Sequence, residues 1–114
     1  MNSHIISKSI SKQELGAMAQ EIFGDMVKVV VDVEKGIMAV NAELHVDLEE
    51  LLLVQGSRPQ DVWGINIYPD NPDESFIEYD SMVNIRPSQG NRSRNVESPQ
   101  VRERIAEVMK KLVI

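Results

Sequence analysis

The chain has 114 residues, the length of one domain, and we expect residues 1–114 to form a single domain around one hydrophobic core. It carries 12 Lys and Arg against 18 Asp and Glu. The formal net charge of -6 argues against nucleic acid or an anionic membrane as a partner, except at a local basic patch. The absence of cysteine excludes disulfides, thiolate nucleophiles and cysteine-based zinc sites. Because no apolar run has the length of a membrane span or a signal peptide, we expect a cytoplasmic protein.

The first predicted element is a helix at about residues 12–23. Ser11 and Glu14 form a capping box at its start, apolar residues follow at helical spacing, and Gly24 is a typical C-terminal stop.

The next segment, residues 25–40, has an ambiguous pattern. The alternating valines of VKVVVDV are typical of a strand, whereas the apolar residues from Met26 to Val40 keep the spacing of a helical stripe. We favour a helix over 25–40 because the stripe is sustained over several turns. The alternative is a hairpin that turns at the sequence EKG.

Three strands and a last helix are predicted in the remaining residues. From Glu43 into LLLVQG, apolar and polar residues alternate as in a strand. The second predicted strand is VWGINIYP, which ends at Pro69, and the third is FIEYDSMVNIR, which ends at Pro87. Ser98 then caps a helix that starts at Pro99 and carries an apolar stripe.

Together these elements predict a two-layer α+β fold, a three-stranded antiparallel meander with two N-terminal helices and one C-terminal helix on one face. Alternation places one set of strand residues toward the helices: Trp63, Ile65, Ile67, Ile77, Tyr79, Val83 and Ile85. The opposite set is expected on an open polar face: Asn66, Tyr68, Glu78, Asp80, Asn84 and Arg86.

The sequence NIRPSQGNRSRN, residues 84–95, is the most informative part of the chain, and we call it the arginine loop. It contains three arginines and no acid, and it leads within a few residues to a helix N-terminus, where main-chain N–H groups and the dipole favour anions. We therefore predict a site for phosphate or carboxylate with these donors: Asn84, Arg86, Ser88, Asn91, Arg92 and Arg94. Alternatively, the arginines pair with acids of their own surface or of a second subunit, and the Asn, Ser and Gly residues form turns.

Candidate metal ligands are present but poorly arranged. Glu43, His45 and Asp47 would share one side of a strand, yet neighbouring same-side positions lie too far apart to converge well on one ion. Glu78 and Asp80 resemble paired acids of metal-dependent nucleases, but no lysine follows at the required spacing. We expect no cofactor and no metal site, and no nucleophile motif is present.

Several sequence segments resemble those of one small prokaryotic family, domain of unknown function 5674. They are FGDMVKVVVDVEK, ELHVD, VWGINIYPD and SMVNIRPSQGNRSRNVESP, so the resemblance covers nearly the whole chain. The family has no assigned activity, cofactor or catalytic residues. The resemblance therefore implies a single-domain cytoplasmic protein and no particular chemistry.

Three functions remain open at this point, and the sequence does not decide whether the protein is an enzyme. The first is a non-enzymatic binding protein that holds a small anionic ligand at the arginine loop. The second is a metal-dependent hydrolase or nuclease-like enzyme in which Glu78 and Asp80, or His45 and Asp47, hold a divalent ion. In the third, the same surface is a homodimer interface.

Overall fold

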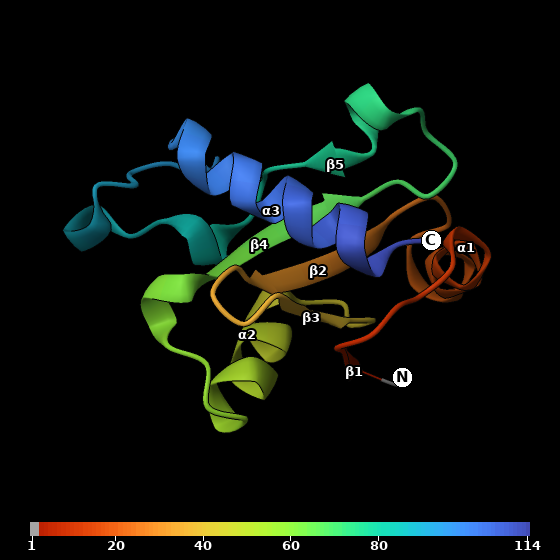
Figure 1. Cartoon of the computed structure of the whole chain (residues 1–114), viewed down its shortest axis with the longest axis horizontal. Coiled ribbons are helices and arrows are strands. Elements are labelled where there is room, and N and C mark those ends of the chain that lie inside the picture. Colours follow the sequence, from red (N-terminus) through yellow and green to blue (C-terminus); the bar gives the residue numbers. More distant parts are fainter. Residues whose placement is uncertain (1–2) are drawn as a thin grey trace.

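The computed structural model of the chain describes residues 3–114, in which three helices cover both faces of one five-stranded sheet (Figure 1). The strand order is β1-β3-β2-β4-β5 and every neighbouring pair is antiparallel. The strands are β1 (His4–Ile6), β2 (Val27–Asp32), β3 (Ile37–Val40), β4 (Val62–Ile67) and β5 (Ile77–Glu78). The helices are α1 (Lys12–Ile22), α2 (His45–Val54) and α3 (Pro99–Leu112). The α+β class and the antiparallel sheet are confirmed, while the three-stranded meander is wrong.

Residues 25–40 form the β2–β3 hairpin, so the predicted helix is wrong and the alternative hairpin is correct. The turn is closed by Asp32, which is fully buried and whose Oδ1 accepts from the N–H groups of Glu34 and Lys35 at 2.9 Å. Gly36 completes the turn with a φ of 68°, a conformation that favours glycine.

The predicted strand that starts at Glu43 is also wrong, because the segment forms α2. Its buried residues are His45, Leu48 and Leu52, which are spaced three and four apart as on one face of a helix. The alternation seen in the sequence falls largely on exposed positions, since Leu44 and Val46 are 54% and 52% exposed.

The second predicted strand is confirmed as β4, whereas the third is reduced to the two residues of β5. After β5 the chain makes 3-10 turns at Met82–Asn84 and Pro87–Gln89 instead of continuing in the sheet. Most of the residues expected to face the helices belong to the larger hydrophobic core or pack against it: Trp63, Ile65, Ile67, Ile77 and Tyr79. Val83 lies instead against Gly64 on the other face, and Ile85 is 39% exposed.

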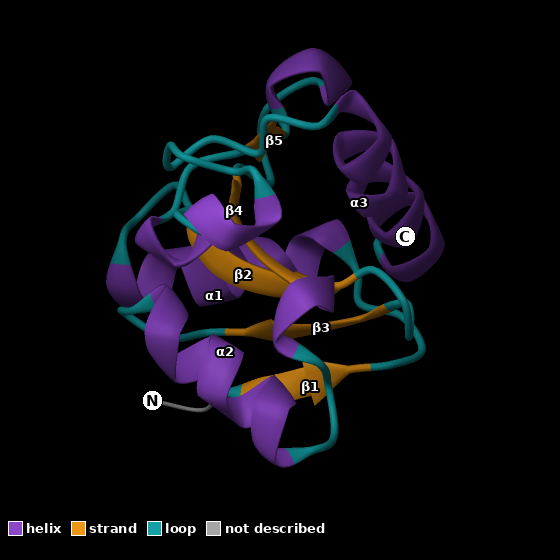
Figure 2. Cartoon of the chain, turned by 90° about the vertical axis from the view of Figure 1, so that its left-hand side faces the viewer, coloured by secondary structure: helices purple, strands orange, loops and turns teal. Residues whose placement is uncertain are grey.

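The helices lie on both faces of the sheet, which corrects the expectation of one open polar face. Figure 2 shows α2 and α3 on opposite sides of the sheet. The larger core cluster joins α1 and α3 to alternate residues of the central strands, among them Val29, Val31 and Ile65. A second cluster joins Leu48 and Leu52 of α2 to the opposite positions Val30, Ala39 and Val62. Because both faces are covered, the central strands are buried on both sides.

The first and last helices confirm the local capping signals. Ser11 Oγ accepts from Glu14 N at 3.0 Å, and Ser98 Oγ accepts from Val101 N at 3.3 Å, one residue before Pro99. The end of α3 returns beside the start of α1, where Ile10 N donates to Leu112 O at 2.7 Å (Figure 1). Within residues 3–114, no helix combines the length and apolar character needed to cross a bilayer.

Candidate functional site

Two buried asparagines hold the arginine loop in place. Asn84 is fully buried, and its side-chain amide bonds both the N–H and the C=O of Gly64, at 2.8 and 2.9 Å. Asn91 donates to the carbonyls of Asn84 and Asn95 at 2.8 and 2.7 Å, and its Oδ1 accepts from Glu97 N at 2.9 Å. These amide groups are used within the fold, which gives both residues a structural role.

Arg86 likewise forms its hydrogen bonds with groups of its own chain. Its guanidinium donates to the main-chain carbonyls of Pro59 at 2.8 Å and Val83 at 3.0 Å, and also to that of Val62. It pairs with Glu49 of α2 at 3.4 Å, and its side chain is 13% exposed. Burial lowers the pKa of Arg86, against the opposing effect of Glu49. The group therefore fixes the arginine loop to the start of β4.

The arginine loop already holds an anion of its own chain. Glu97 Oε2 accepts from the main-chain N–H groups of Arg92 and Ser93, both at 2.9 Å, and from the Ser93 hydroxyl at 2.7 Å. The hydrogen bond from the Ser93 hydroxyl lowers the pKa of Glu97 most, and the hydrogen bonds from these amides lower it further. Ser88 and Arg92 are exposed, and the charge of Arg92 also contributes to lowering the pKa of Glu97. Anion binding by the loop itself stays a prediction.

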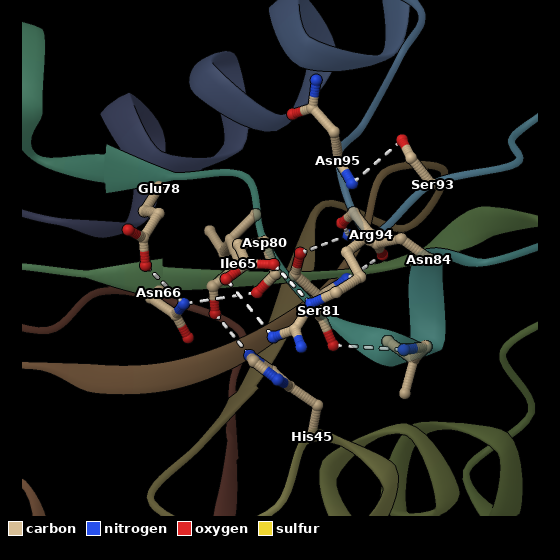
Figure 3. A network of polar contacts seen from close by, with 12 residues as sticks. His45, Ile65, Asn66, Glu78, Asp80, Ser81, Asn84, Ser93, Arg94 and Asn95 are labelled. Carbon is tan, nitrogen blue, oxygen red and sulfur yellow. Dashed lines mark hydrogen bonds and ion pairs between the residues drawn. The ribbon is translucent and has the colours of Figure 1, made fainter.

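Arg94 is the predicted donor that lines a pocket together with His45, Glu78 and Asp80. Its guanidinium makes a forked pair with the carboxylate of Asp80, at 2.7 and 3.3 Å, with both side chains partly exposed. The pocket has a volume of about 310 Å³, within the range of small-molecule sites. It lies between the start of α2, the end of β4 and the segment that follows β5 (Figure 3). We call it the His45 pocket. Its lining residues are Met26, Lys28, Leu44, His45, Asn66, Glu78, Asp80, Ser81, Met82, Val83 and Arg94.

Asn66, on β4, is the buried polar residue of the His45 pocket. It is 5% exposed, and its Nδ2 donates to Glu78 Oε1 at 2.8 Å and to the Asp80 carbonyl at 3.3 Å. Its Oδ1 has no hydrogen-bond partner among residues 3–114. In Figure 3 this oxygen points away from Glu78, toward the side of His45. An unpaired buried acceptor costs free energy, so a donor that enters the pocket gains a strong partner there.

His45 forms the opposite wall and is neutral near neutral pH. Its Nε2 lies 2.8 Å from the carbonyl of Ile65. Because a carbonyl can only accept, Nε2 carries the proton and Nδ1 keeps a lone pair. Burial, aided by the charge of Lys28, lowers the pKa of His45. The Ile65 carbonyl, Asp80 and Asn66 oppose this shift. The imidazole ring lies close enough to Asn66 for the amide to raise the pKa of His45, although no hydrogen bond joins the ring to Asn66 Oδ1.

The start of α2 adds unpaired main-chain donors at the wall of the His45 pocket. The N-cap residue is Leu44, whose side chain cannot accept, and no side chain caps this end. The Asp47 amide bonds the Leu44 carbonyl at 3.2 Å, while the amides of His45 and Val46 have no acceptor among residues 3–114. Free N–H groups at a helix N-terminus attract anions.

The structure places the residues considered as metal ligands in separate positions. His45, Glu78 and Asp80 line the same pocket, whereas Glu43 and Asp47 are exposed on or before α2. No group of three or more His, Asp or Glu side chains in residues 3–114 is arranged to hold a metal ion. The idea of three ligands along one strand side is wrong, because that segment is helical.

Sequence reasoning misses the role of two residues in the His45 pocket. The predicted helix over 25–40 includes Lys28, which lies instead on β2, and strand alternation places Asn66 on a polar face without a role. A detectable signal for Asn66 is a polar amide next to the end of the otherwise apolar strand VWGINI, opposite Glu78 in the β4–β5 register.

The fold and the pocket define the class of the protein as a small α+β domain with one antiparallel sheet between helical layers. The chain belongs to the family described as protein of unknown function DUF5674, whose model matches residues 4–112. The resemblance seen in the sequence is thereby confirmed. No match to the chain was found among curated proteins or among solved structures.

Proposed function

We propose that this protein is a non-enzymatic binding protein that holds a small anionic ligand in the His45 pocket. One observation carries the proposal: Lys28, Arg94 and the uncapped start of α2 all lie at the wall of one pocket of about 310 Å³. An ammonium group, a guanidinium group and free amides are the donors that recognise carboxylate and phosphate. Arg94 is the part of the predicted arginine set that carries this role.

The other members of that set support the site from outside it. Asn84 accepts from Gly64 and donates to the Arg94 carbonyl at 3.0 Å, so it fixes the main chain from which the Arg94 side chain extends. Arg86 and Asn91 hold the two ends of the arginine loop. A binding group held by buried hydrogen bonds loses little freedom when a ligand arrives.

A binding role is favoured over catalysis by the one hydroxyl in the pocket wall. Ser81 is fully buried, and its Oγ accepts from Val83 N at 3.2 Å, as the cap of the turn Met82–Asn84. No hydrogen bond joins it to His45 within residues 3–114, as a nucleophile and its base would require.

The test is a titration of the ¹⁵N-labelled protein with inorganic phosphate and with acetate, followed by amide shifts. We expect saturable shifts at His45, Asn66 and Arg94. Arg94→Gln should weaken binding about tenfold, since it removes a charge-assisted contact. The matched control is Arg92→Gln, two residues away in the same loop, which should bind as the wild type does. Saturable binding lost in Arg92→Gln instead would move the site to the loop surface, and the absence of any saturable shift would refute the proposal.

The homodimer interpretation uses the same surface and makes a different prediction. If the arginines cross to acids of a second copy, self-association weakens in Arg92→Ala and at high salt, because exposed ion pairs are screened. Sedimentation equilibrium at two salt concentrations measures this directly. A wild type that stays monomeric in both removes the interface as an explanation for the arginine loop.

A further inference from the structure

The His45 pocket contains opposite charges in addition to its anion-binding groups. Glu78 and Asp80 line it together with Lys28 and Arg94. Asp80 forms a partly exposed forked pair with Arg94, whereas Glu78 forms no ion pair within residues 3–114. Its Oε1 accepts from Asn66 Nδ2 and from the Tyr68 hydroxyl, at 2.8 and 3.1 Å, and these donors are neutral. The carboxylate of Glu78 therefore keeps its negative charge available to a ligand.

The orientation of the Asn66 amide follows from its neighbours. Nδ2 faces the Glu78 carboxylate and the Asp80 carbonyl, which are both acceptors. The flipped amide would bring Oδ1 against these acceptors and lose both bonds. Oδ1 is therefore a fixed acceptor that points away from Glu78, toward the side of His45 (Figure 3).

Three donor side chains of the pocket wall contact groups other than Asn66 Oδ1. The Nε2–H of His45 bonds the Ile65 carbonyl, and the Arg94 guanidinium bonds Asp80. Lys28 Nζ lies over the ring of Phe23, 5.2 Å from its centroid. An occupant of the pocket can supply the donor that Oδ1 lacks, and the charge of Glu78 favours a cationic donor.

The remaining wall is apolar. Met26, Leu44, Met82 and Val83 line the pocket, and Leu44 and Met82 are 54% and 65% exposed. Methionine side chains adapt to ligands of different shape. An aliphatic group of a ligand would bury these exposed side chains and gain free energy from that burial.

We propose that the occupant is a small zwitterion, an α-amino acid with an apolar side chain. Its carboxylate lies toward Lys28, Arg94 and the start of α2, and its ammonium group donates to Asn66 Oδ1 and Glu78. This inference rests on the proposed function, since it adds an ammonium subsite to the same anion site.

The experiment compares three compounds with one branched carbon skeleton by calorimetry and amide shifts: L-leucine, 4-methylpentanoate and 3-methylbutylamine. We expect leucine to bind about tenfold more tightly than 4-methylpentanoate, because only leucine fills the ammonium subsite. The amine without a carboxylate should bind weakly. Glu78→Gln keeps an acceptor for Asn66 but removes the charge, so it should bring leucine and 4-methylpentanoate to similar affinities. Glu74→Gln, on the exposed turn Asp73–Ser75, should not change the ratio.

The outcomes separate the two proposals. If leucine and 4-methylpentanoate bind equally to the wild type and both depend on Arg94, the zwitterion is refuted while the anion site stands. If neither carboxylate binds, the proposed function fails and the zwitterion fails with it. A leucine preference that survives in Glu78→Gln would overturn the assignment of the ammonium subsite.

Discussion

The guanidinium group of Arg86 lies over the ring of Trp63, 4.7 Å from the ring centroid. In the same position it donates to the carbonyls of Pro59, Val62 and Val83. A planar cation with several N–H groups can satisfy all of these contacts at once, which a lysine ammonium cannot. The arrangement gives Arg86, one of the predicted ligand-binding arginines, a structural role.

Replacing Arg86 with lysine should therefore destabilise the protein although the charge is kept. We expect a loss of about 1–3 kcal/mol in the free energy of unfolding, because buried carbonyls lose their donors. Urea unfolding followed by Trp63 fluorescence measures the change. Arg92→Lys is the matched control and should unfold as the wild type does. Equal stability of the two variants would refute the structural role of Arg86.

Gly64 has no room for a side chain. A Cβ atom there would lie 2.6 Å from Ser81 Cβ and Oγ and 2.8 Å from Val83 Cγ2. Gly64→Ala should destabilise the protein by about 1–3 kcal/mol through overpacking. Gly16 in α1 is the contrasting case, since a Cβ added there would meet no atom of another element within 4 Å among residues 3–114. Gly16→Ala should instead stabilise by about 0.5–1 kcal/mol, through helix propensity. Thermal unfolding of both variants tests the pair, and a neutral Gly64→Ala would show that the β4 neighbours can move.

Acid should destabilise the protein through His45. Its pKa is lowered in the folded state from about 6.5, so below that pH the unfolded chain binds more protons than the folded one. The contribution of neutral His45 to the free energy of unfolding is fully present above pH 6.5 and is lost as the pH falls through the lowered pKa. His45→Gln can still donate to the Ile65 carbonyl, and it should remove this part of the pH dependence. Urea unfolding between pH 5 and pH 8, in steps of about half a unit, measures the slope. A slope unchanged in His45→Gln would contradict the assignment.

Glu97 should control the order of the arginine loop. Because its pKa is lowered from 4.5 by Ser93 and by the loop amides, its contribution is present above pH 4.5 and is lost as the pH falls through the lower value. The amide shifts of Arg92 and Ser93 should titrate with a midpoint below 4.5. Glu97→Gln should abolish this titration and speed hydrogen exchange at both amides, while Glu103→Gln on α3 should change neither. Exchange rates unaffected by Glu97→Gln would show that other contacts order the loop.

The elements predicted correctly are those defined by neighbours in the sequence. Ser11 with Glu14, and Ser98 with Pro99, specify helix starts through local hydrogen bonds and local dihedral angles. The hairpin at residues 27–40 resembles a helix in sequence because both faces of β2 are buried. Val30 faces α2 while its neighbours face the other core, and burial on both sides removes the simple alternation of a strand.

The site can be predicted in part. Strand alternation correctly places Glu78, Asp80 and Asn66 near one another, and the composition of the arginine loop points to Arg94. The contribution of α2 cannot be found in this way, because Leu44, Val46 and Leu48 alternate with polar residues and indicate a strand. The sequence pattern places His45 on a strand, whereas the structure places it on α2. The proximity of His45 to Asn66 results from long-range packing, which no local sequence pattern encodes.

Side chains rather than a strand complete one edge of the sheet. β5 pairs with β4 at Asn66 and Ile67, while at Gly64 the main chain is bonded by the Asn84 amide, and at Val62 by Arg86. An uncovered strand edge is a template for another chain, and its exposure leads to aggregation. Asn84 and Arg86 thus protect the protein from intermolecular β-pairing. A variant that loses both should form insoluble β-rich assemblies at concentrations where the wild type stays in solution.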